Sequence, residues 1–174
     1  SINQGISNGN SAVALLQIAD KSMAEQSKIL DTVKAKLIQA NTDTTSADGR
    51  TAIAKDVSKL LEQLNNIAKQ TNYNGTNLLQ AAATSTATKT ALSFQIGENP
   101  SDMIETAAIQ ANTLGYGLDT LSAAAGTGAS AAAGASVFTR AQATAGQTAV
   151  DTAITKLNGY RGDIGSTQNQ VESA

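Results

Sequence analysis

The chain has 174 residues, a formal net charge of −2 and 15% charged residues, and it contains no Cys, His or Trp. Without Cys or His, the sequence excludes disulfides, thiolate or imidazole metal sites, and any catalytic pair that uses histidine as the base. The absence of a basic stripe argues against nucleic acid as a partner, and no uncharged apolar run reaches the roughly 20 residues that cross a bilayer.

The first predicted element is a long amphipathic helix over residues 2 to about 41. Its apolar positions recur at the spacings that place side chains on one face of a helix. These positions are Ile2, Ile6, Val13, Leu16, Met23, Leu30, Val33 and Leu37. Turn and cap residues follow over 41–46, and either Ser46 or Asp48 is the predicted N-cap of a second helix.

The second predicted helix has the clearest heptad pattern in the chain, which is typical of a coiled-coil seam. The seam consists of Ile53, Val57, Leu60, Leu64 and Ile67. The helix is predicted to end near Thr71. Asn74-Gly75 then favours a tight turn with positive φ, after which Leu78 and Leu79 fold back against the helices.

A loop is predicted over 81–91, where the Ala/Thr-rich sequence has no periodicity. Residues 92–96 alternate apolar with polar side chains, 97–102 contain turn residues, and 103–109 are predicted to return as an antiparallel strand. Almost all residues over 121–136 are Ala, Gly or Ser. Because such small side chains bury little apolar surface, a flexible connection is predicted there.

A third long helix is predicted from about residue 137 to the end, with Arg161 and Asp163 among its exposed positions. Gly159, Gly162 and Gly165 weaken it, because each glycine inside a helix costs about 1 kcal/mol relative to alanine. One explanation is a flat strip where another backbone approaches, either within the bundle or from a neighbouring molecule. The other explanation is a locally frayed helix.

Several stretches near both ends of the chain together resemble the conserved regions of bacterial flagellins. The N-terminal stretches are 8–20, 30–34, 64–75 and 94–97, and the C-terminal ones are 153–157, 161–165 and 168–171. The resemblance covers most of the chain except about 81–91 and 121–140. It is fairly specific, because both regions match in the same order along the chain.

The resemblance implies a mainly α fold, with long antiparallel helices in a coiled-coil-like bundle, two N-terminal and one C-terminal, beside a small β-hairpin. It implies a single inner core domain formed by 1–120 and 137–174. The connection over 121–136 would stand in place of the family's variable outer domains. The chain is expected to be a fragment that lacks both terminal coiled-coil segments.

The function implied by the resemblance is that of a secreted structural subunit that self-assembles into the extracellular flagellar filament for motility, without a cofactor, nucleic acid or membrane. Its partners would be other copies of itself, joined by repeated helix-to-helix contacts that do not close on themselves. The candidate subunit contacts are Asn8, Asn10, Gln17, Arg161, Gln168 and Asn169.

A second implied partner is the Toll-like flagellin receptor of animal hosts. Many flagellins carry a Gln-Arg-x-Arg-x-Leu pattern on the first long helix, and the corresponding positions here are Asp31, Thr32, Lys34 and Lys36. Thr32 stands where the family's key Arg would be, and Lys36 stands where its key Leu would be. Because Arg and large apolar side chains dominate protein interfaces, we expect weak or no activation of that receptor.

Three alternatives to a filament subunit remain open at this stage. A hook-filament junction protein would share the helical core, and a secreted adhesin or surface-layer module would share the Ala/Thr/Ser-rich composition. An enzyme would have to use paired carboxylates such as Glu25 with Asp31, or Glu98 with Asp102. Neither pair is flanked by the apolar residues that would perturb a carboxyl pKa, so catalysis is not expected.

Overall fold

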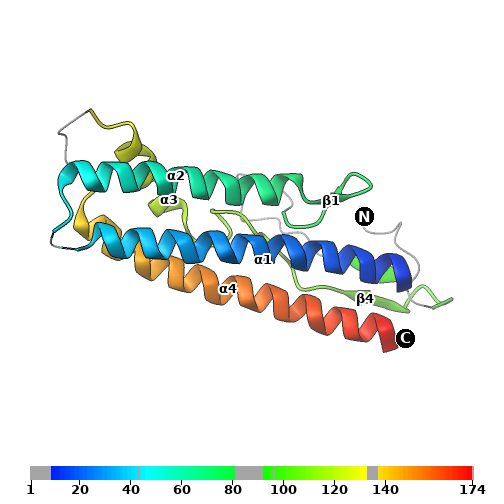
Figure 1. The fold of residues 1–174 in the computed structure, drawn as a ribbon. Coiled ribbons are helices and arrows are strands. Elements are labelled where there is room, and N and C mark those ends of the chain that lie inside the picture. The colour runs from blue at the N-terminus through cyan, green and yellow to red at the C-terminus, as the bar shows by residue number, and fades with distance from the viewer. Residues whose placement is uncertain (1–8, 43, 81–91, 96, 133–136, 174) are drawn as a thin grey trace.

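The computed structural model describes residues 9–42, 44–80, 92–95, 97–132 and 137–173 (Figure 1). This part of the chain is dominated by helices α1 (Gly9–Ala40), α2 (Ala47–Gln70), α3 (Asp119–Ala129) and α4 (Arg140–Ser173). The helices α1, α2 and α4 lie side by side along the long axis, and α2 and α4 both run antiparallel to α1 (Figure 1). The predicted mainly α bundle of two N-terminal helices and one C-terminal helix is therefore confirmed.

Helix α1 matches the described part of the first predicted helix, and residues 1–8 lie outside the described residues. Its buried face repeats at alternating steps of three and four residues. The positions in this seam are Leu16, Ala19, Met23, Gln26, Leu30, Val33, Leu37 and Ala40, of which only Gln26 is polar. Apolar burial of this kind is the main force that holds the three long helices together.

The bounds of α2 confirm one of its two predicted N-caps and its predicted end near Thr71. Ser46 is the N-cap, because its Oγ accepts a hydrogen bond from the Gly49 N–H at 3.0 Å, and Thr71 is the C-cap. The predicted seam is only partly buried, since Leu60 and Ile67 are half-buried while Leu61 and Ala68 fill the core. The reason is that α2 packs against both α1 and α3, so its buried face is wider than a two-helix seam.

Two short antiparallel ladders lie beside the bundle. Strands β1 (Asn72–Tyr73) and β2 (Thr76–Asn77) are joined by Asn74 and Gly75, whose φ angles are 52° and 81°. This is the predicted tight turn, and both angles suit the right-handed twist of a hairpin. The chain then folds back as predicted, and Leu78 and Leu79 are fully buried.

The second ladder pairs β3 (Ser93–Gln95) with β4 (Met103–Glu105), with Phe94 opposite Ile104. The predicted return strand over 103–109 is thus shorter than expected. After Glu105 the chain leaves the ladder and crosses the bundle, and we call residues 106–118 the strap. The loop predicted over 81–91 lies outside the described residues.

The flexible connection predicted over 121–136 is wrong for its first part, because α3 is a helix that packs on α2 and α4. Leu121 is the large apolar side chain of this helix, and it is buried together with Ala125 and Gly128. A Cβ on Gly128 would lie 2.9 Å from the Cβ of Ala54 on α2. Small residues therefore allow α3 to approach its neighbours closely, and residues 133–136 lie outside the described part.

Helix α4 continues without a break through Gly159, Gly162 and Gly165, so the predicted fraying is wrong. A Cβ added at any of the three would meet nothing within 4 Å, which also excludes close packing inside the bundle as their reason. The close approach on α4 occurs instead at Gly146, where a Cβ would lie 2.8 Å from a methyl carbon of Leu121. Approach by a neighbouring molecule stays a prediction for the three exposed glycines.

Candidate functional site

The strap is attached to the bundle by a buried polar side chain in the middle of α1. Gln26 is fully buried, and its Nε2 donates hydrogen bonds to the carbonyl oxygens of Leu64, at 3.1 Å, and Ala111, at 2.7 Å. Its Oε1 accepts a hydrogen bond from the Tyr116 hydroxyl at 2.7 Å. One amide group thus connects α1, α2 and two points of the strap.

Polar groups from α2 and α4 hold the same segment. Both amide atoms of Asn65 bond to Thr113, where Oδ1 accepts from the backbone N–H at 2.8 Å and Nδ2 donates to Oγ1 at 3.0 Å. Lys156 Nζ donates to the Gly115 carbonyl oxygen at 2.8 Å. The strap is therefore fixed by side chains from all three long helices.

Two tyrosines complete this region, with ring centroids 6.0 Å apart. Burial raises the pKa of Tyr116 well above its ordinary value, and the neighbouring Tyr160 raises it further. Burial also raises the pKa of Tyr160, although a hydrogen bond from the Gln110 N–H partly offsets that effect. Both hydroxyls are kept neutral, so they serve as hydrogen-bonding groups of the fold.

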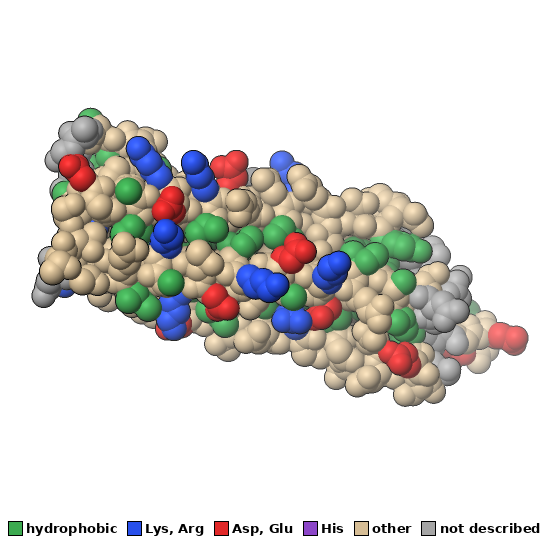
Figure 2. All heavy atoms as spheres, viewed as in Figure 1, with side chains coloured by type: hydrophobic (Ala, Val, Ile, Leu, Met, Phe, Trp, Pro, Cys, Tyr) green, Lys and Arg blue, Asp and Glu red, His purple; other side chains and the backbone are tan. Residues whose placement is uncertain are grey.

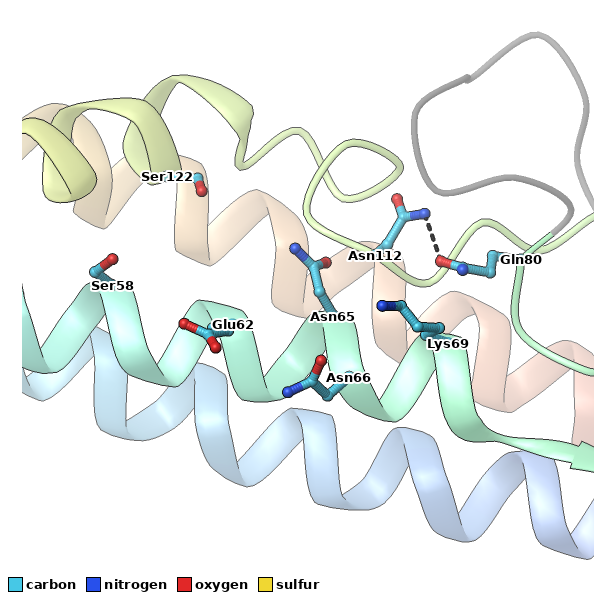
Figure 3. Close-up of a pocket in the computed structure, with 8 residues that line it drawn as sticks. All are labelled: Ser58, Glu62, Asn65, Asn66, Lys69, Gln80, Asn112 and Ser122. Atoms are coloured by element: carbon cyan, nitrogen blue, oxygen red, sulfur yellow. Dashed lines mark hydrogen bonds between the residues drawn. The ribbon is translucent and has the colours of Figure 1, made fainter.

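A polar pocket of about 310 Å³ lies between α2, the strap and α3. Figure 3 shows side chains of α2 in a row along the helix, across the pocket from Gln80, Asn112 and Ser122. The lining residues are Ser58, Glu62, Asn65, Asn66, Lys69, Gln80, Asn112 and Ser122. The Asn112 amide nitrogen donates to Gln80 Oε1 at 2.8 Å, which fixes the orientation of the Gln80 amide.

The candidate receptor-facing residues do not form one patch. Asp31 and Thr32 are exposed on α1. Lys34 pairs with Asp151 on α4, and Lys36 pairs with Asp56 on α2 at 3.1 Å. The two lysines therefore lie on opposite flanks of α1, where they also connect it to its neighbours.

The candidate subunit contacts are spread along the bundle. Gln17 and Asn169 are exposed, and Gln168 donates to Glu172 on the same helix at 2.9 Å. Arg161 donates through Nε to Asp20 on α1 at 2.8 Å, and this hydrogen bond raises the pKa of Arg161. Asn8 and the side chain of Asn10 lie outside the described residues. Arg161 thus links α4 to α1 within the molecule.

One face of the molecule shows lysines and acidic residues interspersed along the helices, with apolar side chains visible in the groove between α1 and α2 (Figure 2). The partly buried residues packed against the core include Ile29, Leu60 and Ile67. The most exposed large apolar side chain among the described residues is Ile38, at 50%. The face of the bundle shown in Figure 2 is mainly polar.

The carboxylate pairs weighed for catalysis sit in open positions. Glu25, Asp31 and Glu98 are exposed, and Asp102 Oδ2 accepts a hydrogen bond from the Asn99 N–H at 3.2 Å. The described residues contain no cluster of three or more acidic, His or Cys side chains that could hold a metal ion. None of the helices described is both long and apolar enough to cross a bilayer.

Sequence analysis did not single out Gln26, Tyr116 or the polar pocket. A signal for Gln26 was present, because it interrupts the apolar heptad between Met23 and Leu30. A polar residue at such a position indicates either a buried hydrogen-bonding group or a break in the seam. The pocket had no comparable signal, since Gln80 and Asn112 reach it from loops.

Comparison with protein families matches residues 1–84 to the bacterial flagellin N-terminal helical region. Flagellin A of Helicobacter mustelae is 39% identical over 109 residues, which cover 59% of this chain and 22% of that protein. The flagellin of Listeria innocua is 29% identical over 167 residues, covering 94% of this chain and 56% of that protein. The chain thus spans about a fifth of the length of the curated relatives that it matches first.

Solved structures extend the similarity over the whole bundle. The crystal structure of Bacillus cereus flagellin superposes with a TM-score of 0.71 at 26% identity, over 96% of this chain and 87% of that one. The structure of FliC from Burkholderia pseudomallei superposes with a TM-score of 0.65 at 15% identity, a likeness that concerns the fold alone. The fold is therefore similar to these proteins at both the N-terminal and the C-terminal helices.

Proposed function

We propose that the chain, whose residues 1–84 match the bacterial flagellin N-terminal helical region, is a structural subunit of the flagellar filament. The observation that carries the proposal is that sequence and fold agree across both termini, with the family match at the N-terminal helices and the structural match over nearly the whole chain. In this proposal the protein is secreted and forms part of the extracellular flagellum.

The architecture supports a mechanical role in assembly. Helix α4 has 34 residues, about 50 Å at 1.5 Å per residue, and it lies along α1 as one side of a rigid rod. The same surface on every copy would meet a different surface on the next copy, and such a contact builds an open helical polymer when it does not close. Subunits of this kind support motility by stiffness and shape, with no chemical step.

The test is to isolate filaments sheared from the bacterium that makes this protein. Mass spectrometry of the sheared material is expected to find the chain as its major component, and deletion of the gene is expected to remove filaments and swimming. A deletion strain that keeps full-length filaments and swims normally would contradict the proposal. Loss of filaments with the protein present only at the hook would favour the junction role.

The domain organisation proposed here is a single core built from 1–120 and 137–174. The connecting segment, which includes α3, occupies the place where the resemblance puts variable outer domains. Because α3 packs on α2 and α4, we regard it as part of the core. Limited proteolysis tests this, since cleavage is expected after Ala129 and not within α3, as exposed segments are cut before packed helices.

Weak or absent activation of the Toll-like flagellin receptor is also part of the proposal. It rests on Thr32 and Lys36, which differ from the family pattern in type, and on Lys36 already being paired with Asp56. In a reporter-cell assay the protein is expected to be inactive at nanomolar concentration, while Thr32→Arg with Lys36→Leu gains activity. Nanomolar activation by the unaltered protein would contradict it.

A further inference from the structure

The described part of the chain contains the dipeptide Asn-Gly in two different backbone settings. Asn74-Gly75 forms the turn between β1 and β2, whereas Asn158-Gly159 lies in the middle of α4. A third copy begins at Asn8, which lies outside the described residues. Asn74 and Asn158 are both exposed, so solvent reaches both side chains and the two settings differ in their backbones.

An Asn-Gly dipeptide can react with itself in water. The backbone nitrogen of the glycine gives its proton to water or hydroxide and attacks the side-chain Cγ of the asparagine. The new N–Cγ bond closes a five-membered succinimide, the bond from Cγ to the side-chain nitrogen breaks, and that nitrogen leaves as ammonia. Glycine favours the attack because it has no Cβ beside the nucleophile.

Water then opens the succinimide ring at one of its two carbonyl carbons. Opening at Cγ restores the original backbone and leaves an aspartate side chain. Opening at the backbone carbonyl carbon gives isoaspartate, in which the main chain runs through Cβ and Cγ. In both cases the sum of the steps consumes one water molecule and releases one molecule of ammonia.

The attack requires a glycine N–H without a hydrogen bond and a peptide plane that can rotate. In the turn, Tyr73 is paired with Thr76, and the Gly75 N–H makes no hydrogen bond within the described residues. A Cβ on Gly75 would meet nothing within 4 Å, so the space around this residue is open. The turn therefore leaves the reacting nitrogen available.

The hairpin that carries Asn74 is short and is fixed only at its base. Strands β1 and β2 have two residues each, and an isolated two-stranded ladder is marginally stable. At the base, Asn77 Nδ2 donates to the carbonyl oxygens of Ala68 and Lys69, both at 3.1 Å. The tip projects beyond the end of α2 (Figure 1), so its peptide planes can rotate without disturbing the bundle.

Helix α4 holds the second dipeptide in a fixed conformation. The helix continues without a break through Asn158 and Gly159, so the Gly159 N–H is bonded to the carbonyl oxygen four residues earlier. Leu157 and Tyr160, on either side of the dipeptide, are buried. Attack at Asn158 therefore requires a local opening of α4, which costs free energy that the hairpin tip does not need.

We propose that Asn74 is a site of spontaneous deamidation, with water as the only co-reactant, and that α4 protects Asn158 from the same reaction. The product carries a new carboxylate at the tip of the β1–β2 hairpin. Because no enzyme sets the rate, the modified fraction records the time since the chain was made. This inference goes beyond the proposed filament role and does not depend on it.

The two products affect the hairpin differently. Asp-Gly suits the same positive-φ turn as Asn-Gly, so the aspartate form keeps the hairpin. Isoaspartate adds a methylene group to the main chain, and the pairing of Tyr73 with Thr76 then loses its register. We expect faster hydrogen exchange at the Thr76 amide in the isoaspartate form, with α2 unchanged because Asn77 still holds the base.

Peptide mapping of the full-length protein tests the proposal, with the second dipeptide as an internal control. The protein is incubated in mildly alkaline buffer and digested at acidic pH, and mass spectrometry follows the conversion of amide to carboxyl at each asparagine. We expect Asn158 to react at least about tenfold more slowly than Asn74, the factor that corresponds to an opening free energy of about 1.4 kcal/mol. In concentrated urea the two rates are expected to converge, because the reacting atoms are the same.

Asn74→Gly is the matched variant. Gly-Gly also suits this turn and has no side-chain amide, so the hairpin peptide is expected to stay unmodified while Asn158 reacts at its unaltered rate. A mass change that persists in the hairpin peptide of this variant would place the reaction at another residue and overturn the assignment.

The native rates decide the proposal. Equal rates at the two sites, or a rate at Asn74 that is as strongly suppressed relative to urea as the rate at Asn158, would overturn it. A rate at Asn74 that stays close to its value in urea, with Asn158 protected, would establish it. Neither result depends on whether the protein forms filaments, so failure of this inference leaves the filament role standing.

Discussion

The three-helix bundle and the strap that crosses it are held in different ways. In the bundle, the seam of α1 contributes seven apolar side chains and one polar one, and helix packing depends on non-directional burial. The strap, in contrast, is held by specific hydrogen bonds of 2.7–3.0 Å with Gln26, Asn65 and Lys156. The difference teaches that periodicity determines the bundle, whereas individual hydrogen bonds determine where the strap lies.

The largest expected effect comes from the bundle seam. Leu30 is fully buried in α1, so Leu30→Ala is expected to lower the free energy of unfolding by about 2–5 kcal/mol through lost burial and a cavity. Urea denaturation followed by circular dichroism measures it. Ile38→Ala, on the exposed side of the same helix, is the control and is expected to change stability by less than about 0.5 kcal/mol.

The next effect concerns the link between bundle and strap. Gln26→Ala leaves the carbonyl oxygens of Leu64 and Ala111 and the Tyr116 hydroxyl without this partner, and we expect a loss of about 2–4 kcal/mol. Hydrogen exchange should rise chiefly at the backbone amides of the strap. If exchange rises equally throughout α1 and α4, the strap has no separate attachment and the comparison is wrong.

Two glycines allow a packed position to be compared with an exposed one, because Gly→Ala should lower stability at the first and raise it at the second. At Gly128 a Cβ would lie 2.9 Å from the Ala54 Cβ and 2.8 Å from the Phe138 Cβ, so Gly128→Ala is expected to destabilise by about 1–3 kcal/mol. Gly162→Ala places a methyl group in open space and is expected to stabilise the monomer by about 0.5–1 kcal/mol. Thermal unfolding of the two variants compares them directly.

The last expected effect is a pH dependence of stability in alkali. The pKa of Tyr116 is raised in the folded state above its ordinary value of 10.0, so the unfolded chain loses this proton first as the pH rises. The stability contribution is therefore complete below pH 10 and is lost progressively above it. Tyr116→Phe should lose about 1 kcal/mol at neutral pH and show a shallower decline in alkali, with Tyr160 supplying what remains. An equally steep decline would contradict this assignment.

Periodicity and cap residues predicted the parts of the fold that depend on local sequence. The heptads predicted α1 and α2, Ser46 predicted an N-cap, and Asn74-Gly75 predicted a hairpin, because each of these signals acts over a few residues. The resemblance supplied the arrangement of the helices. The lengths of β4 and of the strap could not be predicted, since they depend on bonds to Gln26 and Asn65, which are distant in sequence.

The prediction for α3 was wrong because its packing depends on residues that are distant in sequence. Composition suggested that Ala, Gly and Ser over 121–136 bury too little surface to fold, but small residues also let a helix lie close to its neighbours. The contact of Gly128 with Ala54 exists only in the assembled bundle. The polar pocket was missed for a similar reason, because Gln80 and Asn112 meet there only after the strap has docked.

Immunogold electron microscopy of the source bacterium, with serum raised against this chain, tests the central claim most directly. We expect gold along the whole length of the flagellar shaft, because every subunit of the filament would carry the chain. Gold confined to the hook, or absent from the flagellum, would contradict a filament subunit.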